Sequence, residues 1–234
     1  MINLNQEPRI DVIVPVLNEG AVLEQFYQRI RAVPLDINLI FIDNASTDST
    51  LSILESFKDI TVIRHDCNEG YGASICDGIL NSIEDVIVII DADCEYPPES
   101  LPEMVHRLED VDVVYASRFL KAVYYNVPFF KMLGNKIISS LFNLLFHQNL
   151  TDLYTGCKTL KRSALKGISL ERKGFEHVVE LSIKLAKKGV AIADVHVDFS
   201  PRQTGRSKMK HLQETSKCIY LIFYYFFNLS KWKN

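Results

Sequence analysis

The sequence predicts an α/β protein built on a doubly wound sheet. Short β-branched runs alternate with helical segments through the first half of the chain, and short links join them. The run DVIVII at 85–90 is apolar throughout, which is typical of a central parallel strand that is covered on both faces. Helices are therefore expected on both faces of the sheet.

Each expected helix of the first half follows a strand and carries a start or stop signal. Pro34 ends the first helix, and the capping residues Ser46, Thr47 and Asp48 introduce the second. The expected strands are 10–16, 38–43, 60–64, 85–90 and 112–117, and the expected helices are 20–32, 50–57, 71–83 and 98–108.

A long helix is expected at about 126–147. Its polar residues recur at every fourth position and nearly everything between them is apolar, so we expect this narrow polar stripe to face water. The stripe consists of Lys131, Asn135, Ser139 and Asn143. A strand near 157–160, a helix at 176–187 and a strand at 190–199 are expected to follow.

Two apolar segments are expected to be shielded from water by a membrane or by protein. The helix at about 126–147 and the run CIYLIFYYFFNL at 218–229 are aromatic-rich and bordered by lysines, and neither contains the roughly 18 consecutive apolar residues that a membrane span needs. They could lie in a membrane interface, in the protein core or in a dimer seam. We expect the interface, with residues 1–210 forming the main domain and residues 211–234 a C-terminal membrane-interface helix. A membrane partner subunit and a homodimer both stay open.

The charge is unevenly distributed along the chain. The net charge of −3 argues against a nucleic-acid partner bound through bulk positive charge. Residues 158–234 carry 16 Lys and Arg but only 6 Asp and Glu, whereas residues 1–157 carry 10 and 23. The basic second part favours anionic lipid headgroups, although lysines on a solvated face would give the same count.

Cysteine usage and the first residues indicate the compartment. The 5 cysteines are odd in number, irregularly spaced and without a CxxC pair, which argues for a reducing compartment. The opening MINLNQEPRIDV has neither the basic nor the apolar region of a signal peptide. We therefore expect a cytoplasmic protein, peripheral on the cytoplasmic face of a membrane.

Acidic residues follow three of the first four expected strands. Ligands of open α/β sheets bind beyond the carboxyl ends of the strands, so Asp43, Asp91, Asp93 and Glu95 should converge in one crevice. Crowded carboxylates are costly unless a cation lies between them, and their hard oxygen atoms suit Mg²⁺ or Mn²⁺.

Structural interpretations compete with this one. Asp43 and Asp48 could cap the helix that follows them, and Asn68-Glu-Gly-Tyr-Gly could be an ordinary turn. Asp91 and Asp93 could be a solvated end of a strand. The conjunction of these groups is more specific than any one of them.

Ordered motifs resemble those of a known family. VIVPVLNEG, FIDNASTDST, NEGYGASICDGI, VIVIIDADCEYPPE and YASRF stand in the order and spacing of family 2 glycosyltransferases with the GT-A fold. TDLYTGCKTLKRSAL, GFEHVVELSIKLAKKG and SPRQTGRSK resemble the branch of dolichol-phosphate mannosyltransferases and polyprenyl-phosphate glucosyltransferases. The resemblance implies a Rossmann-like, mixed and mostly parallel sheet flanked by helices, with interfacial amphipathic helices.

The resemblance assigns roles at the nucleotide side. Asp91 and Asp93 match the DxD acids that bring Mg²⁺ or Mn²⁺ to a diphosphate, with Glu95 beside them as a third metal-site residue. The residues implied in nucleotide-sugar binding are Pro15, Asn18, Glu19, Asp43, Asn68, Gly70 and Asp91.

It also assigns roles at the acceptor side. Arg118 belongs to the SR pair of the family, and Arg202, Ser207 and Lys208 belong to the late R-x-x-G-x-S-K motif. The implied catalytic residues are Asp93, Arg118, Arg202 and Lys208, and the implied acceptor-phosphate residues are Arg118, Lys131, Arg202 and Ser207. The chain departs from the pattern at Asn44-Ala45, at Lys131, where relatives often carry Arg, and at Cys157-Lys158, where relatives show Phe-Arg.

The resemblance implies transfer of a hexose from GDP-mannose or a UDP-hexose to a polyprenyl phosphate, with inversion and with a divalent metal. A lipid phosphate is largely dianionic at neutral pH and attacks without a strong general base, whereas a sugar hydroxyl needs one. Asp152 could be that base or a structural acid. The alternatives are a family 2 enzyme that extends a saccharide and a non-catalytic nucleotide-sugar-binding protein.

Overall fold

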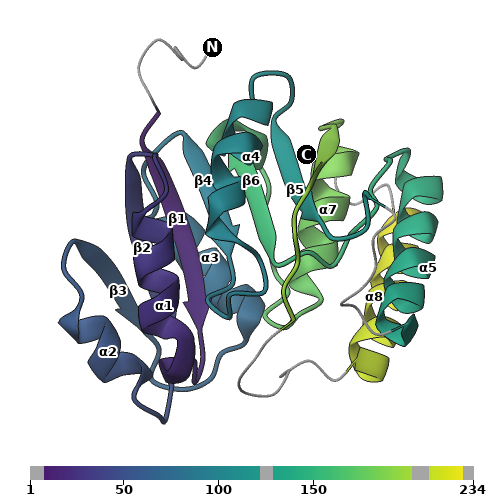
Figure 1. Ribbon diagram of the computed structural model, residues 1–234. Helices are drawn as coiled ribbons and strands as arrows, with labels where there is room; N and C mark the ends of the chain where they lie inside the picture. The colour runs from purple at the N-terminus through teal and green to yellow at the C-terminus, as the bar shows by residue number, and fades with distance from the viewer. Residues whose placement is uncertain (1–7, 122–128, 202–210, 229–234) are drawn as a thin grey trace.

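The computed structural model describes residues 8–121, 129–201 and 211–228. Seven strands form one sheet in the order β3-β2-β1-β4-β6-β5-β7 (Figure 1). The strands are Ile10–Val16 (β1), Ile37–Asp43 (β2), Ile60–Arg64 (β3), Val86–Ile90 (β4), Val113–Ser117 (β5), Cys157–Lys161 (β6) and Ile192–His196 (β7). Only β6 runs antiparallel to its neighbours β4 and β5, so the expected mixed, mostly parallel sheet is confirmed.

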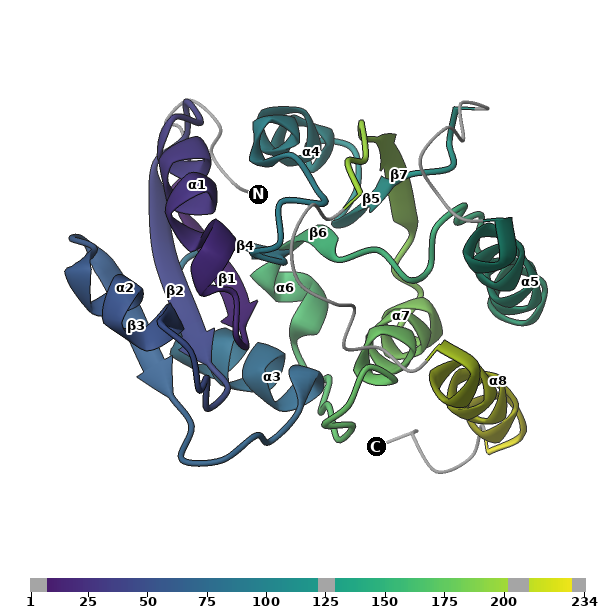
Figure 2. The same ribbon diagram turned by 60° about the horizontal axis from the view of Figure 1, so that its bottom comes forward.

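Helices cover both faces of this sheet. The helices are Gly20–Arg31 (α1), Thr50–Ser56 (α2), Tyr71–Asn81 (α3), the 3₁₀ turn Pro98–Ser100 (η1), Leu101–Arg107 (α4), Phe129–Phe146 (α5), Arg162–Leu165 (α6), His177–Lys187 (α7) and His211–Phe227 (α8). One core cluster joins the sheet to α1, α2 and α4, and a second joins its other face to α3, α5, α6, α7 and α8 (Figure 2).

Alternation along β1 explains the two cores. Val12 and Val14 belong to the first core cluster, whereas Ile13 between them belongs to the second. All three are fully buried, as expected of a strand covered on both faces. The apolar strand sequences therefore determine a layered structure with helices on each side.

Several expected boundaries shift by a few residues. Helix α3 ends at Asn81, because Ser82 is already extended, and the expected helix at 98–108 begins as a 3₁₀ turn at Pro98. The last strand covers Ile192–His196 rather than all of 190–199. The single-turn helix α6 was not expected from the sequence.

The polar stripe of α5 faces inward, so the expectation that it meets water is wrong. Asn135 and Ser139 are buried and, with Asn143, they bond the backbone of the 150–154 loop. That loop has backbone donors and acceptors that no strand satisfies, and the stripe supplies their partners. The side chain of Lys131 lies outside the described residues.

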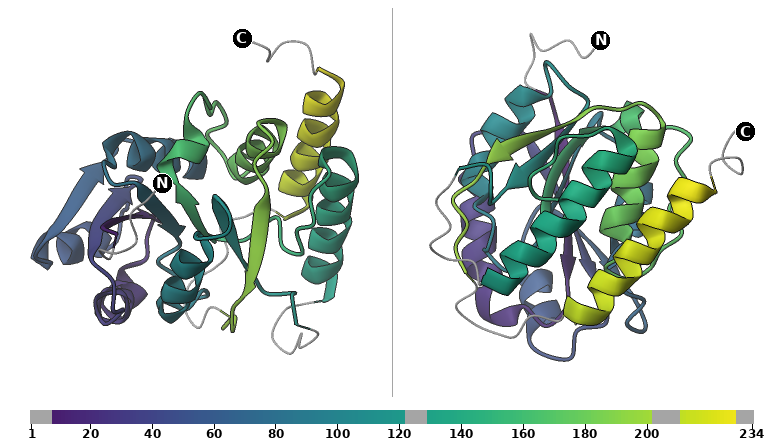
Figure 3. Two further views of the ribbon diagram at one scale, coloured as in Figure 1. Left: turned by 90° about the horizontal axis from the view of Figure 1, so that it is seen from above. Right: turned by 90° about the vertical axis from the view of Figure 1, so that its right-hand side faces the viewer.

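The outer faces of α5 and α8 are apolar instead. The two helices lie side by side at one end of the sheet (Figure 3). Leu144 and Phe227 are 74% and 75% exposed, and the other exposed apolar side chains of these helices are Leu133, Ile137, Tyr220 and Phe223. We call these six residues the α5–α8 apolar face.

The C-terminal run is buried in the protein core on one side of α8 only, and its exposed side leaves the membrane interface and the dimer seam open. Cys218, Leu221, Ile222 and Tyr225 of α8 are buried in the second core cluster, while the opposite side of the helix is exposed. Among the described residues, none of the helices combines the length and the apolar composition that crossing a bilayer demands.

Candidate active site

The carboxyl ends of β2, β1 and β4 lie next to one another because these strands are adjacent and parallel. β2 ends at Asp43, β1 at Val16, and β4 one residue before Asp91. The strand ends therefore bring the expected acidic residues to one edge of the sheet, as the rule for open α/β sheets requires.

Asn18 joins the loop after β1 to the loop after β2. Its Oδ1 accepts a hydrogen bond from the backbone N–H of Thr47 at 2.7 Å, and its own backbone N–H donates to Ser46 Oγ at 2.9 Å. Asp48 fulfils the capping role considered for it, since its carboxylate accepts from the backbone N–H groups of Gly20 and Thr50. The Asn18 side chain thus fixes the loop beside Asp43.

The Asp43 side chain is fully buried, and one of its two carboxylate oxygens accepts no hydrogen bond from the described residues. Its Oδ1 accepts the backbone N–H of Ser46 at 3.0 Å, and Oδ2 is buried with no hydrogen-bond partner among the residues that the structure describes. A buried acceptor without a donor is costly. This oxygen is therefore suited to receive an N–H or O–H group from a ligand.

The loop of Asn68 and Gly70 is held to the end of β2 by Asn44. The Asn44 amide donates to Asn68 Oδ1 at 3.1 Å and accepts the backbone N–H of Glu69 at 2.8 Å. Asn68 Oδ1 also accepts the backbone N–H of Gly70, whose φ of +103° favours glycine. The departure at Asn44 thus creates a clamp between two loops of the site.

Asp91 and Asp93 follow β4 directly. Asp93 is 9% exposed and its Oδ1 accepts the backbone N–H of Glu95 at 3.0 Å. A Cβ atom on Gly156 would lie 2.2 Å from Asp91 Oδ2, so only glycine leaves room there for the carboxylate. The backbone O of Glu95 accepts from Ser200, two residues before Arg202.

The electrostatics of this pair favour a cation. Burial, followed by the charge of Asp93, raises the pKa of Asp91 well above the ordinary range, while Lys158 opposes the rise. Burial lowers the pKa of Lys158 below its usual value. Lys158 is only 2% exposed, and its Nζ donates to the backbone O of Thr155.

These residues fit a divalent metal ion. In the described ranges, no three His, Cys, Asp or Glu side chains form a complete ligand set. Mg²⁺ is usually held by one or two carboxylates together with the phosphates of a substrate. The neighbouring carboxylates of Asp91 and Asp93 fit a site of that kind, and Gly156 leaves the room that the Asp91 carboxylate occupies.

Arg118 reaches the site from the end of β5. It donates from Nε and Nη2 to the two oxygens of Asp152, whose side chain is fully buried. The guanidinium lies 5.7 Å from the Tyr96 ring, in the loop after β4. Burial opposes the charge of Arg118, but the charges of Asp152, Tyr96 and Glu95 and the hydrogen bond to Asp152 together raise the pKa of Arg118. Asp152 is accordingly the ion-pair partner of Arg118, which is the contact expected of a structural acid.

Some expected residues cannot be placed. Arg202, Ser207 and Lys208 lie outside the described residues, as does the side chain of Lys131. Pro15, Glu19, Asn68, Gly70 and Glu95 lie on the loops and strand ends already described.

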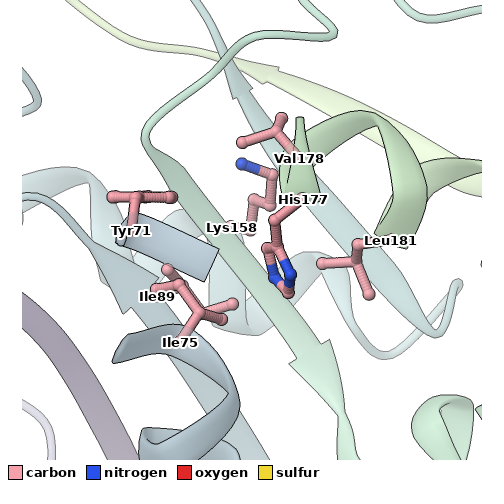
Figure 4. Close-up of a pocket in the computed structure, with 7 residues that line it drawn as sticks. All are labelled: Tyr71, Ile75, Ile89, Lys158, His177, Val178 and Leu181. Atoms are coloured by element: carbon pink, nitrogen blue, oxygen red, sulfur yellow. The ribbon is translucent and has the colours of Figure 1, made fainter. Parts of the chain in front are cut away.

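Three residues that the sequence did not single out for the site border a small pocket beside it (Figure 4). Tyr71, Lys158 and His177 line this pocket together with Ile75, Ile89, Val178 and Leu181. His177 is 1% exposed, and within the described parts of the chain neither ring nitrogen has a hydrogen-bond partner. Tyr71 donates from Oη to Asp91 Oδ1 at 3.0 Å. A single tyrosine in a glycine-rich turn carries no sequence signal for that contact.

Solved structures resemble this fold. Glucosyl-3-phosphoglycerate synthase from Mycobacterium tuberculosis, solved with Mn²⁺, UDP-glucose and glycerol 3-phosphate, has a TM-score of 0.67 at 17% identity, covering 93% of this chain and 79% of that one. Mannosyl-3-phosphoglycerate synthase from Rubrobacter xylanophilus has a TM-score of 0.70 at 16% identity, covering 93% and 73%. At such identities the likeness shows the GT-A fold alone.

Sequence relatives are more informative. A dolichol-phosphate mannosyltransferase of Pyrococcus furiosus is 28% identical over 96% of this chain, which spans 64% of that relative's length. An undecaprenyl-phosphate mannosyltransferase of Micrococcus luteus is 29% identical over 86% of this chain and 87% of the relative. The model of the family described as "Glycosyl transferase family 2" matches residues 11–169. The chain therefore belongs to glycosyltransferase family 2.

Proposed function

We propose that this glycosyltransferase moves a hexose from a nucleotide sugar to a polyprenyl phosphate of the dolichyl or undecaprenyl type. The observation that carries the proposal is the placement of Asp91 and Asp93 directly beyond the central strand of a family 2 sheet. The names of the relatives in Pyrococcus and Micrococcus support the lipid phosphate as acceptor.

The donor lies over the ends of β1, β2 and β4. The spare oxygen of Asp43 accepts a hydrogen bond from the base or the ribose of the nucleotide. Pro15, Asn18 and Glu19 flank it on one side, and Asn68 and Gly70 on the other. GDP-mannose and UDP-hexoses are the donors to compare.

Asp91 and Asp93, with Glu95 beside them, would hold Mg²⁺ or Mn²⁺ together with the diphosphate of the donor. A bound divalent cation supplies neutralisation of the charge that develops on the departing nucleoside diphosphate. The Mn²⁺ and UDP-glucose in the mycobacterial structure support this role for the DxD pair. This role requires that the carboxylates of Asp91 and Asp93 both point toward the bound cation.

The acceptor phosphate approaches from the side of β5. A phosphate oxygen attacks the anomeric carbon, the bond to the nucleoside diphosphate breaks, and the configuration inverts. The buried pairing of Asp152 with Arg118 supports an acceptor that is already anionic, since this carboxylate is engaged. Arg118 contributes positive charge near Tyr96, and Lys131, Arg202, Ser207 and Lys208 contact the phosphates by virtue of their motif positions.

The α5–α8 apolar face lies in the interface of a membrane, on its cytoplasmic face. Leu144 and Phe227 enter the acyl region, and α8, within the 211–234 segment, acts as the C-terminal interfacial helix. A partner subunit or a second copy of the chain on this face is the competing occupant.

The test is transfer of a labelled sugar from GDP-mannose or UDP-glucose into the organic phase with a polyprenyl phosphate. Product formation should require Mg²⁺ or Mn²⁺, stop with EDTA, and be lost in Asp93→Asn. The anomeric configuration of the product, read by NMR, tests inversion. Labelled water-soluble glycan without a lipid requirement would instead establish a saccharide acceptor, and nucleotide binding without turnover would establish a non-catalytic protein.

A further inference from the structure

Tyr71 ties the first turn of α3 to the DxD pair. Its hydroxyl donates to Asp91 Oδ1 at 3.0 Å, and its ring stacks on Phe175 with centroids 5.3 Å apart and an interplanar angle of 17°. The ring and the hydroxyl are therefore fixed by two separate contacts. The partners lie 20 and 104 positions away along the chain, so this arrangement exists only in the folded protein.

The surrounding backbone prevents Tyr71 from moving aside. The backbone N–H of Gly72 donates to the backbone O of Lys173 at 2.7 Å. A Cβ atom on Gly70 would lie 2.3 Å from the same oxygen. The two glycines thus bring the start of α3 into direct contact with the 171–175 loop that carries Phe175.

Glu180 in turn holds that loop. Its side chain is fully buried and accepts the backbone N–H groups of Glu171 and Arg172 at 2.9 to 3.1 Å. Lys184 and Tyr225 donate to its Oε1 at 2.8 and 2.9 Å. A loop anchored in this way presents the Phe175 ring to Tyr71 in one position.

A carboxylate that binds a metal ion needs partners that fix its rotation. Hydrogen bonds from neighbouring groups orient the ligands of metal ions, and losing one typically weakens metal binding about 10- to 100-fold. Tyr71 restrains Asp91 at Oδ1, and Oδ2 packs against Gly156, where a Cβ atom would lie 2.2 Å from it. Both oxygens of the carboxylate therefore have a neighbour that limits its rotation.

We propose that Tyr71 is a positioning residue that orients the Asp91 carboxylate for a divalent cation, and that Phe175 holds Tyr71 in place for this purpose. The inference rests on the proposed metal site. It extends that site to a residue of α3 and to the loop before α7.

The test compares three variants in a titration with Mn²⁺ alone, followed by the EPR signal of the free ion. Tyr71→Phe keeps the ring and its stack but removes the donor, so its Kd for Mn²⁺ should rise about tenfold. Phe175→Leu keeps the donor but removes the stack, so its Kd should rise less. Tyr27→Phe is the matched control, because Tyr27 also stacks on a phenylalanine, Phe57, and donates one hydrogen bond, to the backbone O of Lys58.

The outcomes separate this inference from the function it rests on. Wild-type binding that is lost in Asp93→Asn, weakened in Tyr71→Phe and unchanged in Tyr27→Phe supports the positioning role. Wild-type affinity in Tyr71→Phe overturns it while leaving the metal site intact. Absence of Mn²⁺ binding in the wild type, both with the metal alone and with UDP or GDP added to supply the diphosphate oxygens, overturns both. Thermal unfolding of each variant identifies any loss of fold. If Tyr71→Phe does not fold, the Kd of Phe175→Leu for Mn²⁺ tests the positioning role in its place.

Discussion

Arg118 and Asp152 form a two-pronged ion pair across the end of β5. Nε donates to Oδ2 at 2.6 Å and Nη2 donates to Oδ1 at 2.8 Å, and the backbone N–H of Arg118 also reaches Oδ2, at 3.2 Å. The Asp152 side chain has no exposed surface, and that of Arg118 is 15% exposed. The geometry matches the planar fork of arginine to the plane of a carboxylate.

Removing one partner of this pair should destabilise the fold strongly. In Asp152→Ala the buried guanidinium loses its counter-charge, and we expect the free energy of unfolding to fall by about 3 to 5 kcal/mol. The double variant Arg118→Met, Asp152→Ala should lose less than the sum of the two single changes. Urea unfolding of all four proteins measures the coupling, and additive losses would contradict it.

Buried His177 should make stability depend on pH. Burial lowers the pKa of His177 to about 4 from the ordinary histidine value of 6.5, so below pH 6.5 the unfolded chain binds the proton more readily than the folded one. The stability is present above about pH 6.5 and is lost as the pH falls toward 4. Between pH 7 and pH 5 this group should account for about 2 kcal/mol of lost stability.

Urea unfolding at the two pH values checks the His177 effect by difference. His177→Leu should lose less stability than the wild type on acidification, whereas His106→Gln, at an exposed histidine, should behave like the wild type. An unchanged pH dependence in His177→Leu would show that other groups cause it.

Substitutions at two adjacent residues, one on the inward polar stripe and one on the exposed side, test the orientation of α5. Asn143 donates to the backbone O of Leu150 at 2.8 Å and accepts its N–H at 2.9 Å, so Asn143→Leu leaves both groups unpaired. We expect a loss of about 2 kcal/mol in the free energy of unfolding. Leu144→Gln, at a side chain that is 74% exposed, should change it by less than about 0.5 kcal/mol. The reverse order would contradict the orientation of the helix.

The α5–α8 apolar face should bind anionic vesicles. Replacing both Leu144 and Phe227 with Gln removes roughly 3 kcal/mol of apolar burial, which corresponds to about a hundredfold weaker partitioning. Co-sedimentation with vesicles of phosphatidylcholine and phosphatidylglycerol measures this partitioning. The control replaces Leu80 and Ile83, which are 78% and 81% exposed but lie elsewhere, on α3 and just after it.

Equal losses in the two double variants would mean that the binding is non-specific. A concentration-dependent dimer that forms without vesicles and dissociates in the Leu144, Phe227 variant would assign the face to a second copy of the chain instead.

The sequence predicted the parts of the fold that local pattern controls. The bounds of β1 and β3 agree with the expected runs, because apolar β-branched residues between turn signals leave little choice. Helix α6 was missed because four residues are too few to show a helical period. The convergence of Asp43 and Asp91 at one edge followed from the alternation of strands and helices, whereas the order of the strands came from the structure.

The errors and omissions concern contacts between distant segments. The spacing of Asn135, Ser139 and Asn143 reveals a polar face but not the loop backbone that this face bonds. In the same way, nothing local distinguishes Tyr71, because its partners Asp91 and Phe175 come from other elements. Polarity along a helix predicts where hydrogen bonds are needed, and tertiary structure decides whether water or protein provides them.

Strand β6 has a further consequence because of its direction. It pairs antiparallel with β4 on one side and with β5 on the other, so it starts at the edge where both of its neighbours end. One segment, Gly156 to Lys158, therefore lies between the strand end that precedes Asp91 and the strand end that precedes Arg118. Under the proposed function, a shift of this single segment would displace the donor side and the acceptor side of the reaction at the same time.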